Sequence, residues 1–113
     1  MGALVTRRTA MAGAVCSVAA FATPHRLRAG PVTHEVQIQK FAFEPARITV
    51  KTGDKIKWTN VDLAPHTATA DAFGWDTGEL VRGQSGEVTV TADMETSYFC
   101  VFHPHMKGQI DIT

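Results

Sequence analysis

Residues 98–108 of the chain read Tyr98-Phe-Cys-Val-Phe-His-Pro-His-Met-Lys-Gly108. The stretch begins with the alternation of a β-strand and ends as a turn, and residues 100–106 carry a thiol, two imidazoles and a thioether. Cys100, His103 and Met106 follow one another at three-residue steps, so a strand that leads into a turn can fold these side chains back onto one point. A thiolate, an imidazole and a weakly held thioether suit copper better than the other common metals. The stretch therefore predicts most of a copper coordination sphere.

A second imidazole must come from elsewhere in the chain, and His66 is the best candidate. It follows Leu63-Ala64-Pro65, a rigid apolar approach at the end of a predicted strand. His34 is a weaker rival, because it begins the first predicted strand and is expected to face solvent. His25 lies in a segment without periodicity and is expected to be solvated. His105 stands between two residues that turn inward, so we expect it to point outward.

Period-2 alternation marks short strands from residue 33 onward. They are expected at residues 34–40, 47–51, 55–59, 66–70, 87–91, 96–102 and 108–113, with turns at 52–54 and 60–62. No convincing helix follows residue 22. About seven to eight short strands with turns every 8–12 residues indicate an all-β fold, a β-sandwich with Greek-key connections.

The inward-facing positions of these strands predict one modest hydrophobic core. Its expected members are Val36, Ile38, Phe41, Phe43, Ile48, Val50, Ile56, Trp58, Val88, Val90, Tyr98, Ile110 and Ile112. Alternation over residues 96–102 places Tyr98, Cys100 and Phe102 on one face of a strand. Trp75 lies in a polar, glycine-bearing segment, and its role stays open.

The first 22 residues are expected to be a secretory signal peptide. Arg7-Arg8 form its charged start, residues 10–22 form a small apolar run, and Ala20-Phe21-Ala22 is an A-x-A cleavage site. Thr6-Arg7-Arg8 is similar to a twin-arginine signal, so this route and general secretion both stay open. An uncleaved membrane anchor is the alternative, although the run is short and rich in alanine. A lipoprotein anchor at Cys16 is disfavoured, because Val15 stands where a small residue is needed.

Cleavage would leave a flexible tail at residues 23–32 and one domain at residues 33–113. It removes two arginines and leaves 9 basic and 11 acidic residues. Nothing in the sequence suggests a nucleic-acid-binding function, because it has no basic stripe and no interleaving of aromatic and basic residues. Cleavage also removes Cys16, so Cys100 becomes the only thiol and no intramolecular disulfide can form. A metal ion is the simplest occupant of a lone thiol in an oxidising compartment.

Two motifs resemble the cupredoxin family of blue copper proteins, and together they cover about residues 34–113. The N-terminal motif reads Phe43-x-Pro45-x-x-Ile48-x-Val50-x-x-Gly53-Asp54-x-Ile56-x-Trp58-x-Asn60-x-Asp62-x-x-x-His66. The second, Cys100-x-x-His103-x-x-Met106, is similar to the family's copper loop, and its short spacing with Pro104 is most similar to that of the amicyanins. The resemblance implies a type 1 copper ion with His66, Cys100 and His103 as equatorial ligands and Met106 as the axial ligand.

Thr67 departs from the family pattern. Amicyanins and plastocyanins carry an asparagine directly after the first histidine, and that side chain braces the copper loop. The hydroxyl of Thr67 can serve as the brace, and its backbone N–H can reach the thiolate sulfur of Cys100. The reduction potential stays open, because such hydrogen bonds tune it.

The ligand set and the resemblance predict a periplasmic electron carrier, which is not an enzyme and is expected to be a monomer. Two imidazoles, a thiolate and a weak thioether suit both Cu(I) and Cu(II). Electrons are expected to pass through the exposed edge of His103. The expected docking patch around it comprises Leu63, Ala64, Pro65, Phe102 and Pro104. Its redox partners are expected to be a donor dehydrogenase and an acceptor cytochrome or oxidase, both bound transiently.

Three other functions compete for the same residues. A structural zinc site is disfavoured, because methionine is a poor zinc ligand and only one cysteine is available. A nucleophilic enzyme would use Cys100 with His66 or His103 as its base, but a buried thiol beside Met106 argues against it. A copper chaperone or copper-storage protein is the serious alternative. An exposed tract rich in methionine or histidine would favour it, but the mature chain offers only His103, His105, Met106 and the distant Met94.

Overall fold

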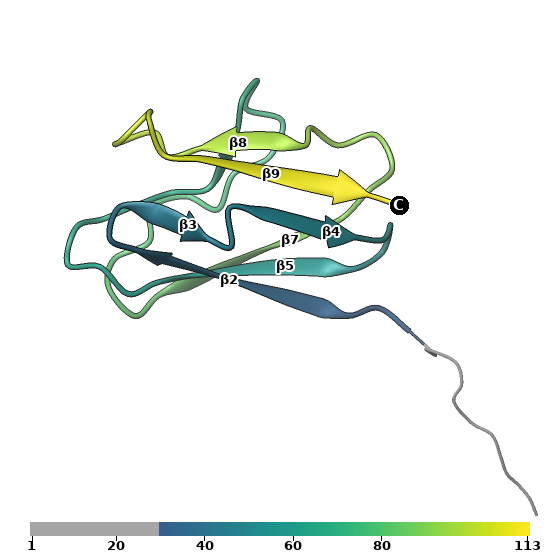
Figure 1. Ribbon diagram of the computed structural model, residues 1–113, viewed down its shortest axis with the longest axis horizontal. Coiled ribbons are helices and arrows are strands. Elements are labelled where there is room, and N and C mark those ends of the chain that lie inside the picture. Colours follow the sequence, from purple (N-terminus) through teal and green to yellow (C-terminus); the bar gives the residue numbers. More distant parts are fainter. Residues whose placement is uncertain (1–29) are drawn as a thin grey trace, which may run out of the picture. The chain divides into compact units, whose positions relative to one another are not determined.

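The structure, a computed structural model, describes residues 30–113 of the chain. These residues form two four-stranded β-sheets and contain no helix (Figure 1). Consequently, no helix within residues 30–113 is long and apolar enough to cross a membrane. The predicted signal peptide at residues 1–22, its cleavage after Ala22, Cys16, His25 and most of the predicted tail lie outside the described residues.

From β3 to β8 the strands alternate between the two sheets along the chain. The first sheet has the order β3-β2-β5-β7 and comprises β3 (Ala42–Glu44), β2 (Thr33–Gln39), β5 (Lys55–Asn60) and β7 (Ser85–Thr89). The second has the order β4-β9-β8-β6 and comprises β4 (Arg47–Val50), β9 (Lys107–Ile112), β8 (Ser97–Phe99) and β6 (Thr69–Ala70). Neighbours that are distant in sequence, such as the parallel pairs β2–β5 and β4–β9, require crossovers between the sheets. The predicted all-β Greek-key sandwich is confirmed.

Alternation along β5 explains how the sandwich buries its core. Ile56, Trp58 and Asn60 are buried, while Lys55 is exposed. Trp58 is opposite Val36 of the parallel strand β2. The indole Nε1 donates a hydrogen bond to the Tyr98 hydroxyl from the facing sheet at 3.2 Å, and burial raises the pKa of Tyr98 to about 12. The two sheets are therefore joined at the centre by apolar packing and one buried hydrogen bond.

Two aromatic residues differ from their predicted positions. Phe41 is 46% exposed, because Lys40 and Phe41 form a left-handed corner between β2 and β3, with φ of 53° and 58°. Phe102 is 48% exposed, because β8 ends at Phe99 and the chain has left the strand when it reaches residue 102. The predictions that Phe41 is buried and that Phe102 shares the face of Tyr98 and Cys100 are therefore wrong.

The remaining differences concern short elements and the rim of the core. Ile48, Val88 and Ile112 are only partly buried, whereas Ala68, Ala70 and Leu80 join the core unpredicted. β3 was not predicted, and the predicted strand at 66–70 is reduced to β6 and an isolated bridge between His66 and Leu80.

Trp75, whose role the sequence left open, closes the edge of the core. Its ring stacks on Trp58 at a centroid distance of 5.4 Å and an angle of 24°. Its indole Nε1 donates a hydrogen bond to the backbone oxygen of Glu95 at 2.9 Å. A polar loop thus contributes one large aromatic side chain to the packing around Trp58.

Candidate metal centre

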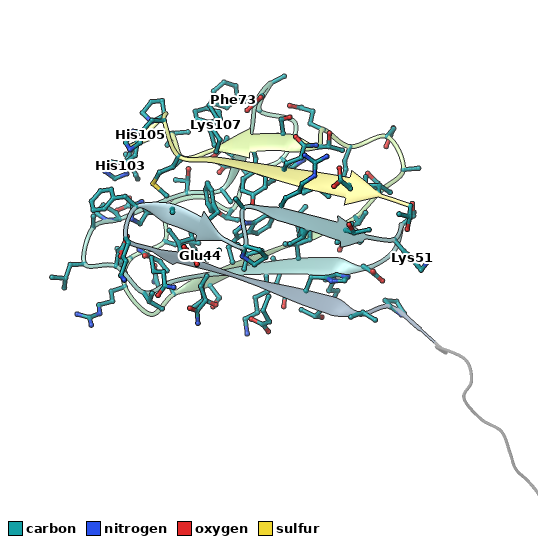
Figure 2. All side chains as sticks on the ribbon, in the orientation of Figure 1. Glu44, Lys51, Phe73, His103, His105 and Lys107 are labelled. Atoms are coloured by element: carbon teal, nitrogen blue, oxygen red, sulfur yellow. The ribbon has the colours of Figure 1, made fainter. Side chains whose placement is uncertain are left out.

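Two consecutive turns fold the loop between β8 and β9. The amide of His103 donates to the carbonyl of Cys100 at 3.1 Å, and the amide of Met106 donates to the carbonyl of His103 at 2.9 Å. The amide of Cys100 in turn donates to the carbonyl of Met106 at 3.2 Å. The three-residue spacing in the sequence therefore corresponds to three-residue turns that gather the side chains at one end of the sandwich. Figure 2 places His103 and His105 at that end.

His66 reaches the same place from the segment that follows β5. Its backbone pairs with Leu80 through hydrogen bonds of 3.1 and 2.8 Å. The buried side chain of Asn60 donates to the carbonyls of Ala64 and Leu80 at 2.9 and 2.8 Å and accepts from the amide of Asp62 at 2.8 Å. Asn60 thus satisfies the polar backbone groups around the turn, which fixes the point from which His66 extends.

The structure brings together three of the four predicted metal-binding side chains. The Cys100 sulfur lies 3.7 Å from Nδ1 of His66 and 3.5 Å from Nδ1 of His103. All three atoms lie within 4.8 Å of one another. His66 and Cys100 are fully buried, and His103 is half-buried. The site is therefore closed on the protein side and open to solvent at one imidazole edge.

Met106 lies in the same loop, with its side chain buried and its backbone hydrogen-bonded to both Cys100 and His103. His105 is exposed, as predicted. His34 does not join the cluster, because its Nε2 lies 2.8 Å from Oδ2 of Asp54.

The half-buried imidazole of His103 is poised to be neutral. Its partial burial, followed by the nearby imidazoles of His66 and His105, lowers the pKa of His103 below its ordinary value, although Asp62 opposes the shift. A neutral imidazole offers a lone pair for metal coordination. Burial, together with the neighbouring imidazoles, therefore favours the neutral state of His103, which can bind a metal ion.

Thr67 makes both of the contacts predicted for it. Its amide lies 3.4 Å from the Cys100 sulfur, and its hydroxyl accepts a hydrogen bond from the amide of Val101 at 3.0 Å. The same hydroxyl lies 2.9 Å from that of Thr69, which donates to Oδ1 of Asp76 at 2.8 Å. The Thr69 hydroxyl donates its proton to Asp76, so it can only accept from the Thr67 hydroxyl. The Thr67 oxygen then uses a lone pair to accept the hydrogen bond from the amide of Val101.

Asp62 is a residue of this site that the sequence reasoning missed. Its Oδ2 lies 2.8 Å from Nε2 of His66, on the side of the ring away from Cys100. Although partial burial raises the pKa of Asp62, hydrogen bonds from the amides of Phe41 and Lys40 and from His66 lower it overall. The only signal in the sequence was a carboxylate four residues before His66, which the turn motif at residues 60–62 explained equally well.

The donor set fits copper. It combines one thiolate and two imidazole nitrogens in a buried cluster, with a thioether in the same loop. Thiolate and thioether select soft metals, and imidazole suits both oxidation states of copper. A structural zinc site would instead require four strong ligands.

Comparisons with known proteins agree with this chemistry. Residues 31–113 match the family model described as copper binding proteins, plastocyanin/azurin family. Amicyanin-alpha of Methylorubrum extorquens is 30% identical over 108 residues, which cover 83% of this chain and 91% of that protein. Chloroplastic plastocyanin of Tetradesmus obliquus is 31% identical over 110 residues, which cover 88% of this chain and 74% of that protein.

Solved structures show the same likeness. A reduced amicyanin variant superposes with a TM-score of 0.63 at 28% identity, covering 72% of this chain and 82% of that one. A copper-containing nitrite reductase from Thermus scotoductus matches with a TM-score of 0.61 at 27% identity. That match covers 77% of this chain but only 23% of the enzyme.

Proposed function

Since the chain belongs to the plastocyanin/azurin family of copper-binding proteins, we propose that it is a periplasmic electron carrier. Its copper would be held by His66, Cys100, His103 and Met106. The observation that carries the proposal is the convergence of a thiol and two imidazole nitrogens within 4.8 Å, from two segments far apart in the sequence. When bound, copper supplies one-electron exchange between Cu(I) and Cu(II).

The surrounding chain would keep the ligands in one arrangement in both oxidation states. Hydrogen-bonded turns hold Cys100, His103 and Met106, and Asn60 holds the turn that leads to His66. Neither segment has to move when the charge of the site changes. Little rearrangement means a small barrier to electron exchange, which is what a carrier requires.

Electrons would enter and leave through the half-buried ring of His103, since His66 and Cys100 are fully buried. Apolar side chains next to these ligands in the sequence are exposed, led by Leu63 at 82% and including Val61, Val101 and Phe102. Phe102 lies beside His103, with ring centroids 6.5 Å apart. A small apolar patch suits the brief contacts of a redox carrier.

The partners are proposed by chemical class. A dehydrogenase would donate electrons, and a cytochrome or an oxidase would accept them. An enzymatic role is not proposed: the likeness to nitrite reductase concerns less than a quarter of that enzyme. Export to the periplasm is proposed from the predicted signal peptide and from the likeness to amicyanins.

Electrochemistry separates a carrier from a chaperone or a storage protein. Copper-loaded protein is cycled repeatedly between the two oxidation states by voltammetry in the presence of a copper chelator, and the bound copper is counted afterwards. A carrier gives reversible waves and keeps its copper. Loss of copper to the chelator on reduction would support the chaperone or storage function instead. His105→Ala is the matched control, because it removes an exposed imidazole from the same loop.

A further inference from the structure

The carboxylate of Asp62 joins two parts of the chain next to the candidate copper site. Its Oδ1 accepts a hydrogen bond from the amide of Lys40 at 2.7 Å, and its Oδ2 accepts from the amide of Phe41 at 3.0 Å. The same Oδ2 lies 2.8 Å from Nε2 of His66. The Asp62 side chain is 15% exposed and that of His66 is fully buried. One carboxylate therefore connects a ligand residue to the corner between β2 and β3.

That corner has an unfavourable backbone. Lys40 and Phe41 both have positive φ, 53° and 58°, which is rare for residues with a side chain. Such a conformation persists only where its surroundings hold it. The two amides of the corner point at the two oxygens of Asp62, so the carboxylate is the group that holds this conformation.

The corner presents the ring of Phe41 to both imidazoles. Its centroid lies 5.1 Å from that of His66 and 4.8 Å from that of His103, with interplanar angles of 88° and 84°. Both contacts are edge-to-face, a favourable geometry for aromatic pairs. Phe41 is itself 46% exposed, so its ring forms part of the outer cover of the two imidazoles.

The hydrogen bond to Asp62 also decides which nitrogen of His66 carries the proton. Nδ1 faces the Cys100 sulfur, and Nε2 faces a carboxylate that can only accept. The proton therefore belongs on Nε2, and the lone pair of Nδ1 points into the cluster. A carboxylate behind a ligating histidine fixes its ring and makes it a stronger donor.

We propose that Asp62 is a positioning residue for the copper site, which fixes His66 in its metal-binding tautomer and seats Phe41 against both imidazoles. A stronger donor and a nearby negative charge both favour Cu(II) over Cu(I), so Asp62 lowers the reduction potential. The proposal rests on the proposed copper site, but its effects on His66 and Phe41 exist in the metal-free protein as well.

The test replaces Asp62 with asparagine, which has one acceptor oxygen in place of two and no charge. Asp93→Asn is the matched control, because it removes an exposed carboxylate from the loop before β8, at the other end of that strand from Cys100. Three quantities are compared. NMR on metal-free protein at mildly alkaline pH gives the His66 tautomer and the contacts of the Phe41 ring. Voltammetry on copper-loaded protein gives the reduction potential.

In the wild type, we expect the His66 proton to reside on Nε2 and to exchange slowly with water. Asp62→Asn mixes the tautomers, weakens the contacts of the Phe41 ring with His66 and His103, and lowers the affinity for Cu(II) relative to Cu(I) by about tenfold. A tenfold change in that ratio raises the potential by about 59 mV. Asp93→Asn changes none of the three by a comparable amount.

The proposal is overturned if the folded Asp62→Asn protein matches Asp93→Asn in all three quantities. It is also overturned if the wild-type protein carries its His66 proton on Nδ1, a measurement that does not depend on how well any variant folds. The NMR readouts need no copper, so a failure of the copper assignment and a failure of the role of Asp62 give different results.

Discussion

At the scale of the residue, Thr67 performs two separate tasks for the ligand loop. Its amide is directed at the Cys100 sulfur. Its hydroxyl oxygen accepts a hydrogen bond from the part-buried amide of Val101. The amide contact depends only on the backbone and would survive any substitution that keeps the fold. The hydroxyl contact depends on the side chain and on the relay through Thr69.

Thr67→Val therefore separates the two tasks. It keeps the shape of the side chain and the N–H···S contact but leaves the amide of Val101 without its acceptor. An unsatisfied part-buried amide costs about 1–3 kcal/mol, so the free energy of unfolding in urea should fall by that amount. Thr67→Ser, which keeps the hydroxyl, is the control and should lose less. Equal stability of the two variants would mean that the hydroxyl does not brace the loop.

Gly108 shows how closely the strand after the loop approaches the core. A Cβ atom at this position would overlap the Tyr98 ring, which lies opposite it in the β8–β9 pair. Gly108→Ala should therefore destabilise the domain by about 1–3 kcal/mol through overpacking. Gly30→Ala is the control, since nothing lies within 4 Å of the added atom. A Gly108→Ala protein as stable as Gly30→Ala in thermal denaturation would contradict this packing.

Single residues also mark the limit of what the sequence could predict. The three-residue spacing of Cys100, His103 and Met106 was visible, because local turns gather these side chains. The contacts of Asp62 and Phe41 with the histidines were not visible in the sequence. They depend on the corner at Lys40 and Phe41, which is far from His66 and His103 along the chain. A buried Phe41 was predicted from alternation, and the left-handed corner breaks that alternation.

At the scale of the element, regular strands followed the alternation and short ones did not. β5 could be predicted, since its buried and exposed positions alternate over six residues. β3 and β6 span three and two residues, too few to show a period. Their positions are fixed by pairing with β2 and β8, which is information that alternation within a short segment does not contain.

Asp54, which precedes β5, connects the beginning of β2 to the end of β4. Its carboxylate accepts from the amides of Val32 and Lys51 at 3.0 and 3.1 Å, and its Oδ2 lies 2.8 Å from Nε2 of His34. The hydrogen bond with His34, followed by those from the two amides, holds the pKa of Asp54 well below its ordinary value.

A carboxyl group whose pKa is lower in the folded state stabilises the fold when it is ionised. That stabilisation is present above the pKa of the unfolded chain, about 3.9, and is lost as the pH falls below it. The free energy of unfolding should therefore decrease with acid below about pH 4. Asp54→Asn should flatten this part of the curve in urea titrations, whereas Asp93→Asn should not. An unchanged slope in Asp54→Asn would exclude Asp54 as the cause.

At the scale of the whole molecule, the candidate metal centre and the C-terminus lie at opposite ends of the sandwich. The loop between β8 and β9 lies at one end of the sheets, and the C-terminus lies at the other (Figure 1). Hydrogen bonds from Asn60 of β5 and within the loop between β8 and β9 hold the candidate ligands, and exposed apolar residues lie near them in the sequence. In the function proposed above, the end that carries this loop is the one that exchanges electrons.

Leu63 tests whether that end is used for docking. Its side chain is 82% exposed, so Leu63→Asp should leave the unfolding free energy and the copper spectrum unchanged. A charge in an apolar contact should slow electron self-exchange between two copies of the protein by about tenfold, the effect of about 1.4 kcal/mol. NMR line broadening in mixtures of the two oxidation states measures this rate. The control Ala92→Asp changes an exposed apolar residue in the loop before β8, at the other end of that strand from Cys100. Equal slowing in both variants would indicate a general charge effect.

The central claim is that His66, Cys100, His103 and Met106 hold one type 1 copper ion. The most direct measurement is the visible absorption spectrum of metal-free protein titrated with Cu(II), for the wild type and for Cys100→Ser. The wild type should turn intensely blue, through charge transfer from thiolate to copper, and saturate at one copper per chain. Cys100→Ser should stay colourless while keeping its fold. A wild-type protein that binds copper without this colour would contradict the claim.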